Sequence, residues 1–338
     1  MSTTKPRIIF MGTPEFAVAS LDALIQAQMN VVAVVTVPDK IAGRGQKLNE
    51  SAVKQYAIAH QLPLLQPERL KATEFLAQLS SLKPDLQIVV AFRMLPQEVW
   101  SLPPLGTFNL HASLLPNFRG AAPINHAIIQ GETETGVSSF LLDKEIDTGA
   151  ILFQEKTAIL PEDNAGSLHD RLMEMGAQVV VKTAQAIIDK TAKAIPQSNF
   201  INSKIWAAPK IFKQDCEINW TLPAQTILQH IKGLSPYPTA ISELHTAIGS
   251  LGISCKIFEA NLIAYSTEKS FPGQIFTDGK NYLYVSCGES QFIALNSIQL
   301  AGKKRLTISC FLRGFHFNLK ETAYFQVDST NIFKNQNH

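Results

Sequence analysis

The chain has 338 residues, enough for two domains, and its 46% hydrophobic and 17% charged residues exclude a disordered protein. No apolar run approaches the roughly 20 residues that span a bilayer, and the N-terminal residues lack the apolar stretch of a signal peptide. We therefore expect a cytoplasmic protein without a membrane partner.

The net charge of +2 conceals an uneven distribution along the chain. Residues 190–338 carry 15 Lys and Arg against 9 Asp and Glu, so the remainder carries 15 against 19. An acidic first half and a basic second half are compatible with a polyanionic partner that is held partly by the second half. Ordinary solvated surface is the commoner cause of an imbalance of this size.

The first half of the chain alternates strand and helix patterns. Apolar runs predict strands at 7–12, 30–37, 62–67, 84–92, 106–113, 135–143 and 149–159. Amphipathic spacing predicts helices at 13–27, 51–60, 75–82, 95–102, 121–130 and 167–190. Repeated strand–helix units imply a doubly wound, mostly parallel sheet, so we expect residues 1–190 to form a Rossmann-like α/β domain.

The pattern changes after residue 190. Residues 191–208 have no clear period, which is typical of a linker. In residues 209–322 the one clear helix pattern is at 224–232, and turns separate strand patterns at 216–220, 239–244, 254–261, 273–279, 281–287 and 292–300. These features predict a small C-terminal β-barrel of the OB-like kind, followed by a tail at 323–338.

The four cysteines are Cys216, Cys255, Cys287 and Cys310. Their gaps are wide and contain no C-x-x-C pair, so the ligand spacing of a zinc site is absent. We expect four free thiols, because a chain of this length without a secretion signal does not need disulfides.

Two polar side chains, Asn109 and His111, lie at the end of the strand expected at 106–113. Residues two apart on a strand project to the same face, and ligands of open α/β sheets bind beyond the carboxyl ends of the strands. An amide can donate to a developing oxyanion, and an imidazole can move a proton near neutral pH. From this stretch alone, Asn109 and His111 can equally well be catalytic residues or ordinary polar residues at a strand end.

Asp147 begins an Asp-Thr-Gly turn between two expected strands. Such a turn on its own is usually structural. Aspartic proteases carry the same three residues, but they need two carboxylates that share a proton, and this chain has one copy in α/β surroundings. A protease is therefore excluded.

Taken together, these residues fit a known pattern. The run N-x-H-x-S-L-L-P-x-x-R-G-x-x-P at 109–123, followed by D-T-G at 147–149, resembles the folate-dependent formyltransferases. Four other stretches are similar to the members of that family that act on tRNA, namely AGRGQKL, WAAPKIFKQDCEINW, LSPYPTA and IQLAGKKRL. The resemblance spans residues 7–306, nearly the whole chain.

The resemblance implies a reaction and a role for each candidate catalytic residue. The α-amino group of methionine on initiator tRNA would attack the formyl carbon of 10-formyltetrahydrofolate, the co-substrate. Asn109 would donate to the oxyanion, His111 would transfer the proton, and Asp147 would orient His111. The resemblance implies no metal, because the formyl group is already activated on its carrier.

The same resemblance implies two sets of binding residues. The folate site would be walled by Ser113, Leu114, Leu115 and Pro116. Arg44 lies between two glycines on an expected mobile loop, where a solvated surface arginine is the alternative to a role near the acceptor end of the tRNA. The remaining phosphate contacts would come from Lys47, Lys210, Lys213, Lys303, Lys304 and Arg305.

Three positions depart from the family pattern. The stretch AFRMLP is one residue shorter than usual and has Arg93 where glycine is common, which affects the expected pterin contacts. Glu145 and Ala150 replace a common glycine and a common acidic residue beside D-T-G. None of these changes falls on a proposed catalytic position.

We expect Arg119 to fix the loop after SLLP rather than to touch substrate.

Two alternatives remain at this level. A formyltransferase acting on an amino-sugar nucleotide or another small amine would keep the chemistry and change the acceptor. A non-catalytic RNA-binding protein on the same scaffold is disfavoured, because Asn109, His111 and Asp147 are retained together. The sequence contains no feature that calls for a dimer, so we expect a monomer.

Overall fold

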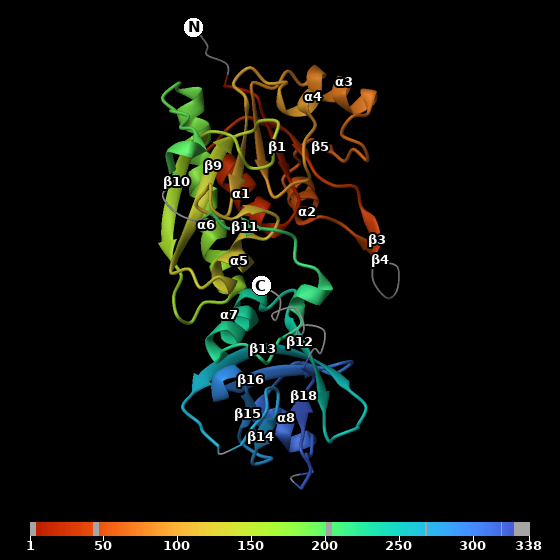
Figure 1. Ribbon diagram of the computed structural model, residues 1–338. Coiled ribbons are helices and arrows are strands. Elements are labelled where there is room, and N and C mark those ends of the chain that lie inside the picture. Colours follow the sequence, from red (N-terminus) through yellow and green to blue (C-terminus); the bar gives the residue numbers. More distant parts are fainter. Residues whose placement is uncertain (1–4, 43–46, 201–204, 268, 319, 328–338) are drawn as a thin grey trace. The chain divides into compact units, whose positions relative to one another are not determined.

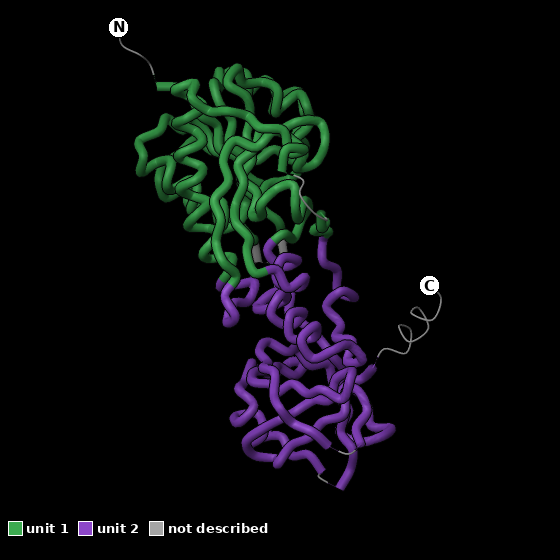
Figure 2. Tube along the Cα trace, turned by 60° about the vertical axis from the view of Figure 1, so that its left-hand side comes forward, with its two compact units in different colours: residues 1–123, 133–159, 168–209 green, residues 124–132, 160–167, 210–338 purple. Residues whose placement is uncertain are grey.

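The computed structural model describes residues 5–42, 47–200, 205–267, 269–318 and 320–327 (Figure 1). The chain forms two compact units, drawn in different colours in Figure 2. Unit 1 contains residues 1–123, 133–159 and 168–209, and unit 2 contains residues 124–132, 160–167 and 210–338. Within the described ranges, none of the helices has both the length and the hydropathy needed to cross a membrane.

Unit 1 is built on a seven-stranded sheet in the order β10-β9-β7-β6-β1-β2-β5. Five strands are parallel: β1 (Ile8–Gly12), β2 (Val31–Val35), β5 (Leu64–Leu65), β6 (Leu86–Val90) and β7 (Thr107–His111). The other two, β9 (Glu134–Leu141) and β10 (Ile151–Ala158), pair antiparallel at one edge. The predicted Rossmann-like, mostly parallel sheet is confirmed.

Helices cover both faces of this sheet (Figure 1). They are α1 (Glu15–Gln26), α2 (Ala52–Ala59), α3 (Thr73–Ser81), α4 (Gln97–Trp100) and α6 (Ala165–Ile188). On one face α3 and α4 bury Phe75 and Val99 against Ile9 of β1. On the other face α6 approaches β7 closely at Gly176, where a Cβ atom would lie 2.7 Å from Leu110. The two faces of β7 therefore have different neighbours.

Unit 2 is a nearly closed antiparallel barrel with strand order β14-β15-β16-β13-β12-β18. The strands are β12 (Ala240–His245), β13 (Ile253–Ile263), β14 (Ile275–Thr277), β15 (Leu283–Ser286), β16 (Phe292–Leu300) and β18 (Tyr324–Phe325), and β17 (Leu306–Thr307) pairs with β16. A bridge between Gln274 and Tyr324 joins the first and last strands. The predicted C-terminal barrel is confirmed, and β18 lies in the segment 323–338 that the sequence predicts as a tail.

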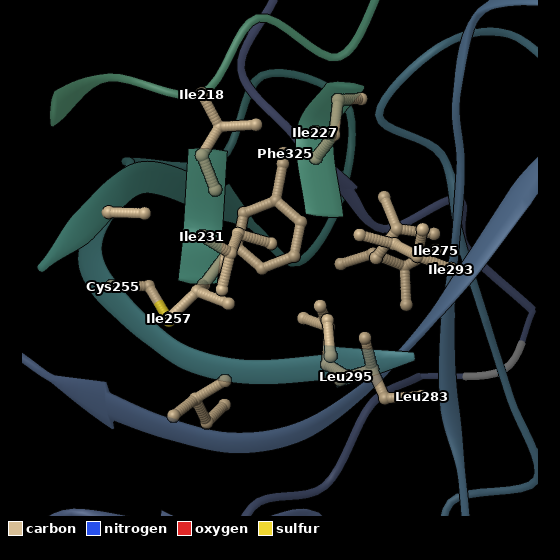
Figure 3. Packing of buried hydrophobic residues seen from close by; sticks show 14 of the residues in the cluster. Ile218, Ile227, Ile231, Cys255, Ile257, Ile275, Leu283, Ile293, Leu295 and Phe325 are labelled. Atoms are coloured by element: carbon tan, nitrogen blue, oxygen red, sulfur yellow. The ribbon is translucent and has the colours of Figure 1, made fainter. Parts of the chain in front are cut away.

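The barrel encloses a continuous apolar core (Figure 3). Trp220 is fully buried, and its ring stacks on Phe325 at a centroid distance of 5.2 Å. Residues of α7 (Ala224–Leu234), such as Ile227 and Ile231, pack on the same cluster. The alternating burial along β13 supplies Cys255 and Ile257 to the core. Burial of this apolar surface is the main source of the stability of unit 2.

Two elements of unit 2 differ from the sequence prediction. The strand expected at 216–220 is absent: Cys216 ends a 3₁₀ turn, and Glu217 makes a single bridge to Ile241. Its alternating apolar residues point into the core without forming a ladder. A helix that was not predicted, α8 (Ile308–Gly314), buries Ile308, Phe311 and Leu312. These three have the i, i+3, i+4 spacing of an amphipathic helix, which is weak evidence in seven residues. The remaining described helix, α5 (Pro123–Ile129), follows β8 (Arg119–Gly120).

All four cysteines are free, as predicted. Among the described residues, no group of three or more His, Cys, Asp or Glu side chains is arranged to hold a metal ion. The segment 191–208, predicted as a linker, is part of unit 1 and contains β11 (Ala207–Ala208), which pairs with β8. The predicted domain boundaries themselves stay predictions.

Candidate active site

The carboxyl end of β7 carries Asn109 and His111 on one face of the sheet. Asn109 pairs with Val89 of β6, whereas Leu110 packs under α6 on the opposite face. The edge where β7 ends is also the edge where β1 and β6 end, next to the point where the strand order reverses. This is the position at which doubly wound sheets bind their ligands.

His111 is 7% exposed, and both of its ring nitrogens face other parts of unit 1. Nε2 lies 2.8 Å from the carbonyl oxygen of Phe118. Since a carbonyl can only accept, Nε2 must carry the hydrogen, which leaves Nδ1 free to take up a proton. Nδ1 lies 3.8 Å from Oδ2 of Asp147, too far for a hydrogen bond but within the range of an ion pair.

Asp147 adopts a left-handed backbone conformation, with φ of 57°. This conformation is uncommon outside glycine, although Asp tolerates it better than most residues. The backbone N–H of Gly120 donates to Oδ2 of Asp147 over 3.1 Å. Gly149, two residues further on, lies so close to β9 that a Cβ atom would be 1.6 Å from the carbonyl oxygen of Leu141. The turn therefore needs its glycine for close approach.

A residue that the sequence did not single out holds this turn. Gln197 is 4% exposed, and its Nε2 donates to the carbonyl oxygens of Asp147, over 2.8 Å, and Gly149, over 2.9 Å. Arg119 donates to Oε1 of Gln197 from Nε and Nη2 over 3.0 and 2.6 Å. Arg119, which lies in the loop after SLLP, is thus bound to the 3₁₀ turn Gln197–Phe200.

The side chain of Asn109 is half-buried and makes no hydrogen bond to any of the described residues. Its neighbour His111, by contrast, is held on both sides. An amide that is placed by a rigid strand and left without a partner can donate to a ligand without breaking an existing bond. The geometry therefore suits stabilisation of an oxyanion at this edge.

The backbone of the SLLP segment is held by hydrogen bonds to side chains of β9 and β10. Ser138 donates to the carbonyl oxygen of Ser113 and accepts from the N–H of Leu115, over 2.6 and 3.0 Å. Gln154 donates to the carbonyl oxygen of Leu115 over 2.9 Å, and the Leu115 side chain is 1% exposed. Pro116 is buried and Leu114 is half-buried, so Leu114 is the member whose side chain is best placed to meet a ligand.

Arg93, the departure in AFRMLP, lies after β6 and is bound by the loop after β5. It donates to the carbonyl oxygens of Glu68, over 2.9 Å, and Pro67, and its guanidinium lies 5.5 Å from the Phe92 ring centroid. Met94 beside it is 75% exposed. The arginine therefore links the loop after β6 to the loop after β5.

Two paired strands, called the hairpin from here on, flank the position of Arg44 in the sequence. Strands β3 (Lys40–Ala42) and β4 (Lys47–Asn49) pair antiparallel, with Ala42 opposite Lys47. Arg44 lies outside the described residues, and so does the side chain of Lys47.

The base of this hairpin is clamped by Lys54 of α2. Its Nζ contacts Asp39, before β3, and lies 2.7 Å from Oε1 of Glu50, after β4. The hydrogen bond from Lys54 lowers the pKa of Asp39, and the hydrogen bond to Asp39 raises the pKa of Lys54. Both groups therefore stay charged near neutral pH. The sequence reasoning missed this lysine, although Ser51 at the cap of α2 marked the start of its helix.

The predicted basic contacts of unit 2 are exposed. Lys303, Lys304 and Lys213 have no ion-pair partner among the described residues. The Nζ of Lys210 lies 5.5 Å from the Phe212 ring centroid. Arg305 differs, because it pairs with Glu259 and donates to Ser297 over 2.8 Å. Three of these side chains are thus free to meet an anionic partner.

Comparisons with known proteins agree with the fold. A family model described as formyl transferase matches residues 6–184, and a second, described as the formyl transferase C-terminal domain, matches residues 210–316. The chain belongs to the formyl transferase family, and it is an enzyme that transfers one-carbon groups.

Within this family the relatives are methionyl-tRNA formyltransferases. The enzyme of Bacteroides fragilis is 51% identical over 311 residues, 92% of this chain and 95% of the relative. That of Azobacteroides pseudotrichonymphae is 52% identical over 318 residues, 93% of this chain and 97% of the relative. That of Flavobacterium johnsoniae is 49% identical over 320 residues, 95% of this chain and 99% of the relative. The resemblance predicted from the sequence is confirmed.

Solved structures are more distant. HypX from Aquifex aeolicus, in complex with tetrahydrofolic acid, has a TM-score of 0.60 at 18% identity, over 92% of this chain and 47% of HypX. WlaRD, a sugar 3N-formyl transferase studied with dTDP and 5-N-formyl-THF, has a TM-score of 0.60 at 20% identity, over 89% of this chain and 100% of WlaRD. At these identities the likeness shows the fold alone.

Proposed function

We propose that this protein transfers the formyl group of 10-formyltetrahydrofolate to the α-amino group of methionine on initiator tRNA, and so serves translation initiation. Relatives of that name align with more than nine-tenths of the chain at about half identity. The observation that carries the proposal is that Asn109 and His111 share one face of β7 at the carboxyl edge of the sheet, with Asp147 3.8 Å from the ring of His111.

Each of the three residues has a task in this reaction. The amine nitrogen bonds to the formyl carbon, and Asn109 donates to the oxyanion that develops on the formyl oxygen. Nδ1 of His111 accepts the proton that the amine loses and returns it to the folate nitrogen as the carbon–nitrogen bond to folate breaks. Asp147 stabilises the protonated ring in between. Atoms and charge balance without a metal ion.

The folate would lie along the carboxyl edge next to the SLLP segment. Ser113, Leu114, Leu115 and Pro116 form one wall in this proposal, with Leu114 contributing the most accessible side chain. The solved relatives HypX and WlaRD were studied with tetrahydrofolic acid and 5-N-formyl-THF, which supports a folate on this fold.

The tRNA would be held by cations of both units. Arg44 and Lys47 of the hairpin and Lys210, Lys303 and Lys304 of unit 2 are the proposed contacts. The exposure of the last three supports this role. The expectations of a monomer and of a cytoplasmic location stay predictions.

The test compares acceptors at one concentration of 10-formyltetrahydrofolate. We expect formyl transfer to initiator Met-tRNA and none above background to an amino-sugar nucleotide, with Arg44→Ala reducing the rate on tRNA. Equal transfer to the amino sugar, together with an unaffected Arg44→Ala variant, would contradict the tRNA assignment. Loss of activity in folded His111→Ala would separate an enzyme from a binding protein.

A further inference from the structure

Described residues on both sides of Gln197 are hydrogen-bonded to the part of unit 1 that holds the candidate active site. Ile195 exchanges two backbone hydrogen bonds of 2.8 Å with Ile151 at the start of β10. Further along, the N–H of Trp206 donates to Oδ1 of Asn117 over 2.7 Å, and the N–H of Phe118 donates to the carbonyl oxygen of Trp206 over 2.7 Å. Gln197 is therefore fixed on a segment that is paired on both sides of it.

The amide of Gln197 uses both of its donors and both of its acceptor lone pairs. The donors bind the carbonyl oxygens of Asp147 and Gly149, and Oε1 accepts two hydrogen bonds from Arg119. Because a guanidinium can only donate, Arg119 requires the oxygen of the amide on its side. The NH₂ group is thereby turned towards the Asp147 turn.

This arrangement supports a backbone that is costly on its own. The left-handed conformation of Asp147 persists only when its surroundings hold it. Gln197 binds the turn on either side of Thr148, and the N–H of Gly120, next to Arg119, binds the carboxylate. Two residues of β8 thus hold Asp147: Gly120 binds its carboxylate directly, and Arg119 acts through Gln197. Together they set its 3.8 Å distance from His111.

We propose that Gln197, oriented by Arg119, is a positioning residue that holds Asp147 in register with His111. The proposal deepens the function proposed above and rests on it for its kinetic consequences only. Gln197 touches no reacting atom in this scheme. Its effect passes through the carboxylate of Asp147 to the ring of His111.

The test replaces the amide in two ways. Gln197→Met keeps the volume and removes all four hydrogen bonds, whereas Gln197→Glu keeps the contact with Arg119 but places a carboxylate against two carbonyl oxygens. We expect both variants to lose about 10- to 100-fold in kcat, the size of effect that slight misplacement of a catalytic group has, with KM values within about threefold of wild type. A loss in kcat with little change in KM separates a misplaced catalytic group from a lost substrate contact.

The matched control is Gln87→Met. Gln87 is also fully buried in unit 1, but it accepts from Thr107 at the opposite end of β7. This variant should keep the kcat of wild type. If Gln197 only filled space and paired with Arg119, Gln197→Glu would behave like wild type, and that result would overturn the proposal.

A second measurement does not depend on activity. In protein with isotope-labelled histidine, the signal of His111 is identified by its loss in His111→Gln, and its chemical shifts are compared by NMR at one pH. We expect shifted ring resonances in Gln197→Met and unchanged ones in Gln87→Met. Unchanged ring resonances in Gln197→Met overturn the proposal. If wild type does not formylate Met-tRNA while the shift is observed, the proposed function fails and the positioning role stands.

Discussion

In unit 1 the side chain of His111 is buried and contacts two other segments, whereas Lys303 and Lys304 of unit 2 are exposed and have no ion-pair partner among the described residues. The difference reflects two tasks. A group that stabilises a transition state must be in place before the reaction, and this requires neighbours that fix it. A group that binds a phosphate needs reach and a hydrated charge, and it acts largely independently of its neighbours.

The largest expected effect concerns how much the apolar core of unit 2 contributes to the stability of the barrel. Trp220→Ala should lower the free energy of unfolding of the barrel by about 3 to 5 kcal/mol, because a fully buried indole that stacks on Phe325 is removed. Hydrogen exchange of the β13 and β16 amides measures this loss. The β1 and β6 amides serve as the internal control. Unchanged protection in β13 and β16 would show that the core does not determine the stability of unit 2.

The next effect concerns the hairpin clamp, which combines charge with fixed position. Lys54→Met should lower kcat/KM for Met-tRNA about tenfold, because Asp39 and Glu50 lose their shared cation and the hairpin loses its orientation. The variant Lys71→Met is the control, since Lys71 makes an exposed pair with Glu98 over 3.5 Å. Equal kcat/KM values for the two variants would show that Lys54 does not orient the hairpin.

A smaller effect is expected at the exposed lysines of unit 2. The double variant Lys303→Ala/Lys304→Ala should raise the KM for tRNA severalfold and leave kcat unchanged. The slope of log KM against log salt should fall by about one for each tRNA phosphate that no longer has a lysine beside it. Kinetics at several salt concentrations measure both quantities. A fall in kcat at saturating tRNA would place these lysines in the chemistry instead.

The smallest effect is a pH dependence of stability in unit 2. Burial lowers the pKa of His230 below its ordinary value of 6.5, against weaker opposing effects of the Cys216 backbone and Asp215. Below about pH 6.5 the unfolded chain binds a proton that the folded state resists, so the free energy of unfolding falls as pH falls and is flat above. Urea unfolding at pH 5.5 and 7.5 should show a smaller difference for His230→Gln than for wild type. An equal change in the free energy of unfolding between pH 5.5 and 7.5 in both proteins would show that His230 does not cause the pH dependence.

The sequence predicted those parts of the site that depend on local pattern. The apolar run at 106–113 placed Asn109 and His111 on one strand, and the turn residues placed Asp147 between two strands. Gln197 gave no such signal, because its partners lie 50 and 78 residues away and its own segment has no period. The bridge between Gln274 and Tyr324, which joins the first and last strands of the barrel, also gave no signal, because the two residues are far apart in the sequence. Contacts that are set by tertiary packing leave no local trace in one sequence.

We expect the free amide of Asn109 to stabilise the oxyanion of formyl transfer. This role is tested by single-turnover transfer from 10-formyltetrahydrofolate to initiator Met-tRNA, measured together with folate affinity. We predict that Asn109→Ala binds the folate as wild type does and transfers the formyl group about 100- to 1000-fold more slowly. Transfer at the wild-type rate by a folded Asn109→Ala variant would contradict the account.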